Sequence, residues 1–214
     1  LHGHLRRAVG RTLVVILPSR VDVERELYSR SYRDFMQAAW RVVEPGVDLR
    51  WNWHLDAICE FLEAVARGDI RRGVMEMPPR IGKSLSSSVI WPAWIWTHNP
   101  ECKFIFGSYA QHLALRDAVK QREIIRSPWY QTRWPLDLVD AGDTKGYFRN
   151  EHGGHRFAAS VGGAATGEGA DIIVVDDPLK AQDAHSELAR TEALRWWREV
   201  MPSRLKDQKT GRRL

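Results

Sequence analysis

The chain has 214 residues, of which 43% are hydrophobic and 28% charged, a composition typical of a globular domain with a sizeable core and not of a disordered chain. Its 32 Lys and Arg against 27 Asp and Glu give a net charge of +5, which is compatible with a polyanionic partner and equally with an ordinary basic surface. No apolar run is long enough to cross a bilayer. Cys59 and Cys102 both lie in apolar settings, which favours reduced thiols over a disulfide framework or a metal site.

The N-terminal part of the chain predicts two amphipathic helices. Apolar residues recur at helical spacing through Val23–Val43, which Pro45-Gly46 ends, and again through Trp51–Ala66, which Gly68 closes. Before them, the apolar run Leu13–Leu17 fits either a strand or the tail of an upstream element.

The rest of the chain alternates between strand and helix patterns. In order, it predicts a strand at Gly73–Met77, a helix at Lys83–Thr97, a strand at Lys103–Phe106, a helix at Ala110–Arg126, a polar loop at Leu136–Gly146, a hairpin of Tyr147–Arg149 with His155–Ser160, a strand at Ala170–Val175 and a helix at Ala184–Val200. Strands that alternate with helices favour a parallel α/β sheet. We therefore divide the chain into an N-terminal helical extension, residues 1–50, and an α/β core, residues 51–214.

The stretch Met75–Leu85 has the order of a phosphate-binding loop: an apolar run, a tight loop ending in Gly-Lys-Ser, and a helix. Gly82 lets the backbone approach an anion, Lys83 would reach the β- and γ-phosphates, and the hydroxyl of Ser84 would hold Mg²⁺. The full pattern has a glycine where this chain has Met77, so a lysine that happens to begin a helix is the alternative. The predicted phosphate-binding residues are Pro79, Arg80, Ile81, Gly82, Lys83, Ser84 and Leu85.

An acidic pair follows the buried strand pattern Ile172–Val175. Ligands bind at the carboxyl ends of strands in open α/β sheets, so Asp176 is predicted to lie beside Ser84 and bind Mg²⁺, and Asp177 to polarise the attacking water. A helix cap or a turn would also explain two aspartates after a strand. Within the loop, Arg80 could reach the γ-phosphate, or the nucleotide of a neighbouring subunit, and stabilise transition-state charge; a surface ion pair is its alternative.

Five segments, in this order along most of the chain, carry a family resemblance: Trp53–Ile58, Pro78–Ser84, Phe106–Ala110, Gly162–Asp171 and Asp176–Lys180. They resemble the motifs of the large terminase subunits of tailed bacteriophages, including that family's Pro-Pro-Arg-x-Gly-Lys-Ser loop and its Asp-Asp-Pro-x-Lys form of the acidic strand.

The resemblance implies a P-loop NTPase of the ASCE type, with a mainly parallel central sheet flanked by helices, that hydrolyses ATP with Mg²⁺. The predicted roles are as follows: Lys83 and Ser84 bind phosphate and Mg²⁺, Asp176 holds the metal, and Asp177, Arg80 and Lys83 are catalytic. Trp51 and His54 fall where the family contacts adenine, although helix capping and core packing explain them equally well.

The implied activity is a motor that drives double-stranded DNA into a procapsid in the host cytoplasm, without secretion or membrane attachment. Implied partners are the portal protein, the small terminase subunit and further copies of the chain in a ring. Family members usually continue into a coupling strand and a nuclease domain, so we interpret this chain as an ATPase portion and assign it no nuclease activity. Candidates for contact with the DNA backbone are Arg122, Arg126, Arg204, Lys206 and Arg212.

Two other functions remain open from the sequence. The first is a helicase or recombination ATPase of the same superfamily. The second is a basic DNA-binding module with an inactive phosphate loop, which Met77 in place of glycine supports.

Overall fold

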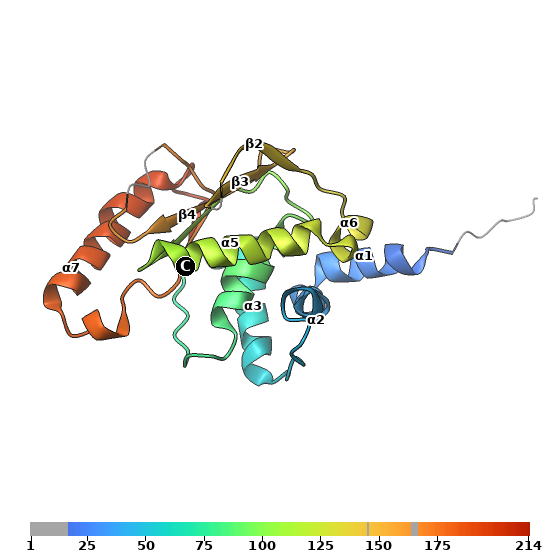
Figure 1. Cartoon of the computed structure of the whole chain (residues 1–214), viewed down its shortest axis with the longest axis horizontal. Coiled ribbons are helices and arrows are strands. Elements are labelled where there is room, and N and C mark those ends of the chain that lie inside the picture. The colour runs from blue at the N-terminus through green and yellow to red at the C-terminus, as the bar shows by residue number, and fades with distance from the viewer. Residues whose placement is uncertain (1–16, 145, 164–166) are drawn as a thin grey trace, which may run out of the picture.

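The structure is a computed structural model that describes residues 17–144, 146–163 and 167–214. It is an α/β fold in which helices flank a six-stranded, mixed and mostly parallel sheet of order β2-β3-β4-β1-β5-β6 (Figure 1). The strands are β1 Phe104–Ser108, β2 Leu138–Thr144, β3 Tyr147–Asn150, β4 His155–Ser160, β5 Ile172–Val175 and β6 Arg212–Arg213. The α/β class and the mostly parallel sheet predicted from the sequence are confirmed.

The helices are α1 Arg20–Arg30, α2 Tyr32–Val43, α3 Trp53–Arg67, α4 Trp91–Ile95, α5 Gln111–Arg126, α6 Pro128–Arg133 and α7 Glu187–Arg195. Two π-helical segments, Leu85–Ile90 and Trp196–Val200, and two 3₁₀ turns, Ala181–Asp183 and Met201–Arg204, complete the described elements. Helices α1 and α7 lie at opposite ends of the molecule, and α5 runs lengthwise between them (Figure 1).

Strands β1 and β5 are covered on both faces of the sheet. Phe104 and Phe106 of β1 belong to the large core that α2, α3 and α4 also fill, whereas Ile105 packs on the other face with Trp196 and Met201. The same alternation holds in β5. This explains why both strands have continuous apolar sequences, because each of their faces meets a layer of helices.

The described part of the N-terminal extension packs into this same large core. The hydroxyl of Tyr32 in α2, for example, donates a 2.6 Å hydrogen bond to the carbonyl of Ser86. The single helix predicted over Val23–Val43 is, however, two helices. Ser31 separates them: its extended backbone ends α1, and its side chain accepts from the amide of Asp34 to begin α2.

The prediction of a strand at Gly73–Met77 is wrong. This segment runs towards the phosphate loop without pairing in the sheet, except that Arg72 forms a parallel bridge with Arg213 of β6. Met75 and Met77 pack against the large core while Val74 is 91% exposed, so the segment has one inward face. Strand β6 comprises only two residues, however, so no neighbouring ladder is long enough to sustain a longer strand here.

The predicted polar loop at Leu136–Gly146 is also wrong, because much of it forms the edge strand β2, antiparallel to β3 with an irregular register. An edge strand bonds on one side only and needs no continuous apolar sequence. The hairpin of β3 with β4 is confirmed. The helix predicted over Ala110–Arg126 does end at Arg126, and Ser127 then caps the short helix α6 that begins at Pro128.

Two expectations fall outside the described residues. Of the run Leu13–Leu17, only Leu17 is described. Of the glycine-rich segment Gly162–Gly169, residues 164–166 are not described.

Candidate functional site

The phosphate-loop lysine and the acidic pair meet at one point of the structure. The Nζ of Lys83 lies 3.1 Å from the Oδ1 of Asp176 and 2.6 Å from the Oδ1 of Asp177. Burial of the Lys83 side chain opposes its charged form, but the hydrogen bonds and charges of Asp177 and Asp176 outweigh that effect and raise the pKa of Lys83. Two segments 94 residues apart therefore form one charged cluster.

Backbone hydrogen bonds hold the two aspartates in place. The amide of Asp176 donates to the carbonyl of Gly107, and the amide of Tyr109 donates to the carbonyl of Asp177. These bonds continue the pairing of β1 with β5 beyond the last paired strand residues. The acidic pair thus lies at the carboxyl edge of the parallel strands, where the sequence predicted it.

Unusual backbone geometry is concentrated around this cluster. Among the described residues other than glycine, only Arg80 (φ 66°) and Asp177 (φ 48°) have positive φ. Gly82, between Arg80 and Lys83, has φ 91°, a conformation that glycine adopts without steric cost. Left-handed arginine is uncommon, and such strain gathers at binding and catalytic sites.

Two cavities meet at this cluster. One, of about 460 Å³, is lined by Met77–Arg80, Gly82–Leu85, Asp177 and Trp40. The other, of about 230 Å³, lies towards α5 and includes Ser84, Asp176 and Asp177 in its lining. Ser84 and Asp177 line both, so the loop and the acidic strand share a continuous polar surface.

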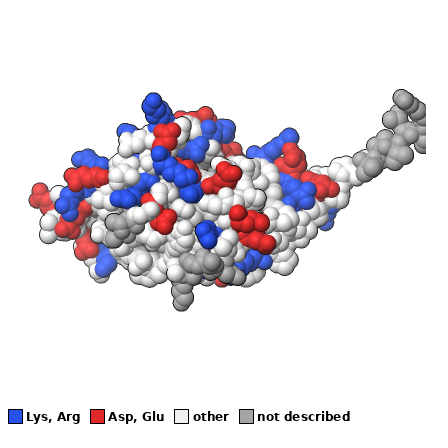
Figure 2. Space-filling view, turned by 90° about the horizontal axis from the view of Figure 1, so that it is seen from above, with Lys and Arg blue, Asp and Glu red and all other residues white. Residues whose placement is uncertain are grey.

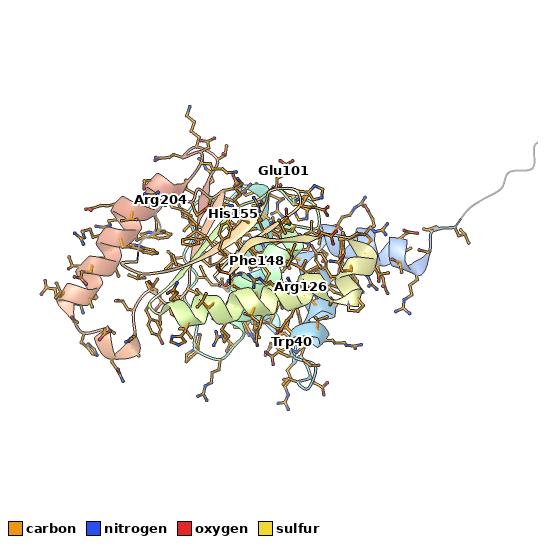
Figure 3. The ribbon with its side chains drawn as sticks, turned by 45° about the horizontal axis from the view of Figure 1, so that its top comes forward. Trp40, Glu101, Arg126, Phe148, His155 and Arg204 are labelled. Carbon is orange, nitrogen blue, oxygen red and sulfur yellow. The ribbon has the colours of Figure 1, made fainter. Side chains whose placement is uncertain are left out.

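Most of the predicted site residues line these cavities, and three do not. Ile81 is absent from both linings. Trp51 instead donates to the carboxylate of Asp56 and stacks under Arg33, and His54 contacts the ring of Trp53. Trp40 of α2, which Figure 3 labels, is the aromatic side chain that lines the larger cavity together with the phosphate loop. The sequence analysis missed it because it treated α2 as an apolar packing helix.

The helix that begins at Lys83 is π-helical between Leu85 and Ile90 before it continues as α4. Pro92 has no N–H for the carbonyl of Ser88, four residues earlier, and this carbonyl accepts instead from the Nη1 of Arg156. The hydroxyl of Ser86 bonds back to the carbonyl of Gly82 at 2.9 Å. Side-chain hydrogen bonds therefore help to hold the helix behind the loop in place, in addition to the backbone hydrogen bonds of the helix.

Arg156 is completely buried beneath the site. Its Nη1 also donates to Gln121 at 2.7 Å, and its guanidinium stacks 3.8 Å from the ring centre of Phe106. Burial lowers the pKa of Arg156 to about 9, although Asp117 opposes this shift. Burial also favours the neutral form of Asp117. It raises the pKa of this carboxyl group by more than the neighbouring Arg116 and Arg156 lower it.

Arg156 and Asp117 line the smaller cavity together with Asp176, and the sequence analysis did not single them out. For Asp117, the sequence did contain a signal. Asp117 and Gln121 occupy the same helical stripe as the buried Ala114, Ala118 and Ile125 of α5, so polar residues interrupt an apolar face.

The site residues fit a magnesium-bound triphosphate. Mg²⁺ prefers oxygen ligands and is usually held by one or two carboxylates together with substrate phosphates, and the Ser84 hydroxyl and Asp176 carboxylate line one cavity. Among the described residues, no group of three or more His, Cys, Asp or Glu side chains could hold a metal alone, so the substrate would have to supply ligands.

No protein-family model matches the chain, and no curated protein matches it. Across the described ranges, no helix combines the length and apolar character that a membrane span requires.

Proposed function

We propose that this chain is an ATP-hydrolysing motor domain of the terminase large-subunit type, with a P-loop NTPase fold of the ASCE kind. The observation that carries the proposal is the convergence of the Lys83 ammonium with the carboxylates of Asp176 and Asp177. A phosphate loop and an acidic strand end must meet in this way if one metal-bound triphosphate is to contact both.

The strand arrangement supports the proposal. Arg72, which precedes the phosphate loop, bridges to β6, and β6 pairs in parallel with β5, which carries the acidic pair at its carboxyl end. One short strand therefore separates the segment that leads into the loop from the acidic strand, and the pairings are parallel, so the loop and the acidic pair follow segments that run towards the same edge of the sheet.

Each residue has a defined part in the proposed hydrolysis. Lys83 offsets the charge of the β- and γ-phosphates, while Ser84 and Asp176 would hold Mg²⁺, which would supply further charge neutralisation. Asp177 orients the attacking water; its side chain is 60% exposed, so water reaches it. Arg80 shares the larger cavity with Lys83 and stabilises the developing charge.

Substitution of the lysine tests the proposal directly. Lys83→Ala should abolish phosphate release from Mg-ATP while the circular dichroism spectrum and a cooperative melting transition, at a slightly lower temperature, are retained. Lys120→Ala is the matched control, because Lys120 is a similarly half-buried lysine that is paired with Glu44, and neither residue lines the two cavities of the site. ATP hydrolysis by Lys83→Ala at the parent's rate would refute the assignment.

An inactive phosphate loop is the second candidate, favoured by Met77 in place of glycine and by the engagement of Lys83 with both aspartates. Titration calorimetry separates the two. The motor proposal expects a binding isotherm for Mg-ATP that Lys83→Ala eliminates, whereas an inactive loop gives no heat of binding with the parent protein.

A further inference from the structure

Three arginines converge on a cleft away from the phosphate loop. The cleft has a volume of about 570 Å³, and Arg71, Arg72 and Arg213 line it together with Pro202 and Leu205. Arg213 is in register with Ile173 at the start of β5, whereas Asp176 follows the end of that strand. The cleft and the phosphate loop therefore lie at opposite ends of the parallel strands.

Two of these arginines are direct neighbours across the sheet. Arg72 and Arg213 form a parallel bridge and line the same cleft. Like charges placed opposite each other on paired strands destabilise a fold. Burial, followed by the charge of Arg72, lowers the pKa of Arg213, which is the electrostatic effect of placing the two guanidinium groups together.

The structure provides little counter-charge for the three arginines. Asp69, which also lines the cleft, is bonded to Arg67 at 2.9 Å. Arg71 donates to the backbone carbonyl of Lys209, and Arg213 lies over the ring of Trp197. Within the described ranges, no ion pair joins Arg71, Arg72 or Arg213 to a carboxylate. An anion from outside the chain would relieve their repulsion.

The chain that forms one wall of the cleft extends the basic character. It carries Arg204, which Figure 3 labels, and further along the chain Lys206, Lys209 and Arg212. The face drawn in Figure 2 shows Lys and Arg interspersed with Asp and Glu. A run of cations beside a cleft suits a polyanion better than a single phosphate, because each neutralised phosphate adds to the affinity.

The lining also indicates which part of a nucleic acid would bind. Among the described residues that line the cleft, none is aromatic. Single strands are held largely by stacking of bases on aromatic rings, whereas a duplex can be held by its backbone through arginine and lysine alone. A cleft of arginines without ring surfaces fits the second mode.

We infer that the cleft of Arg71, Arg72 and Arg213 binds the phosphate backbone of double-stranded DNA without regard to sequence. The choice of DNA among polyanions rests on the proposed function, whereas the presence of the arginine cleft does not depend on it. Because the cleft and the phosphate loop lie at opposite ends of the strands, the duplex and Mg-ATP bind to the chain without competing for one site.

Fluorescence anisotropy with a labelled duplex of arbitrary sequence tests the inference. Loss of two phosphate contacts in the double variant Arg72→Gln, Arg213→Gln should reduce the slope of log affinity against log salt by about 2. The parent's affinity should therefore fall roughly tenfold more than that of the variant between about 50 and 200 mM salt. Arg149→Gln is the control, since Arg149 is an exposed strand arginine of β3; it should retain the parent's slope.

Three outcomes would overturn the inference: a parent chain that binds no duplex, a double variant with the parent's affinity and slope, or displacement of the duplex by inorganic phosphate at constant ionic strength. The last outcome would assign the cleft to a small anion. ATP turnover measured without DNA should be unchanged in the double variant. A parent chain that turns over ATP but binds no duplex would refute this inference alone, whereas a parent chain that binds duplex through these arginines but hydrolyses no ATP would refute the proposed function alone.

Discussion

The cationic side chains at the two ends of the parallel strands lie in opposite electrostatic environments. At the carboxyl end, Lys83 lies between two aspartates and its pKa is raised. At the amino end, Arg213 lies beside Arg72 and its pKa is lowered, by burial first and by Arg72 second. One sheet therefore presents a cluster in which charges complement each other and another in which they repel.

This difference indicates how each site can respond to a ligand. Under the proposed function, a triphosphate with Mg²⁺ would have to exchange partners within the complementary cluster, because Lys83 is already paired with Asp176, the carboxylate proposed for the metal. A polyanion at the arginine cleft displaces no carboxylate and only relieves repulsion. The first site is thus suited to a switch between partners, and the second to simple electrostatic attachment.

The largest expected effect comes from removing one charge at the carboxyl end. Asp177→Asn keeps the size of the side chain but weakens its ability to orient or accept a proton from water, so ATP turnover should fall by about 10²- to 10⁴-fold. Phosphate release under saturating Mg-ATP measures it. Asp48→Asn, at an exposed aspartate after α2, should leave turnover unchanged; equal losses in both variants would remove Asp177 from the mechanism.

A smaller effect is expected on stability when the central cation is removed. Lys83→Met leaves Asp176 and Asp177 without the ammonium between them, and it should lower the free energy of unfolding by about 1 kcal/mol at neutral pH, a modest figure because the pair is partly exposed. Urea denaturation of parent and variant measures the difference.

The pH dependence of that difference follows from the direction of the pKa shift. Because the folded-state pKa of Lys83 is raised, its contribution is fully present below the ordinary lysine pKa of about 10.4 and is lost as the pH rises through the folded-state value. The two proteins should therefore converge in stability in strongly alkaline solution. A difference that stayed constant there would mean that the charge of Lys83 is irrelevant to the fold.

Much of the carboxyl-end site was predictable from the sequence, because short motifs define it. The Gly-Lys-Ser segment before a helix predicts the geometry of the loop. The two aspartates after four aliphatic residues predict a carboxylate pair at the carboxyl end of a buried strand. Trp40 and Arg156 were not predictable as site residues, since only tertiary packing of α2 and β4 brings them to the cavities. For Asp117 the one signal was the polar interruption of the apolar stripe of α5.

The errors in the fold have the same physical origin. Gly73–Met77 has a strand-like sequence, but the sheet offers it no ladder beyond Arg72. Conversely, β2 has a polar sequence but gains backbone pairing from β3. In both cases the neighbouring chain, which the local pattern does not reveal, decided the outcome. The juxtaposition of Arg72 with Arg213 is likewise a consequence of pairing between distant segments.

The smallest expected effect tests the repulsion at the amino end. Arg72→Glu places a carboxylate opposite Arg213 in the same bridge, so attraction replaces repulsion and the free energy of unfolding should rise by about 0.2–1 kcal/mol. Urea denaturation at low salt measures the gain, and it should shrink as salt screens the pair. Arg149→Glu, on the exposed side of β3, lacks this arginine neighbour in the sheet and should give no comparable gain. If Arg72→Glu were neutral or destabilising at low salt, the two guanidinium groups would not repel each other in the folded chain, and the contrast between the two ends of the sheet would be one of composition alone.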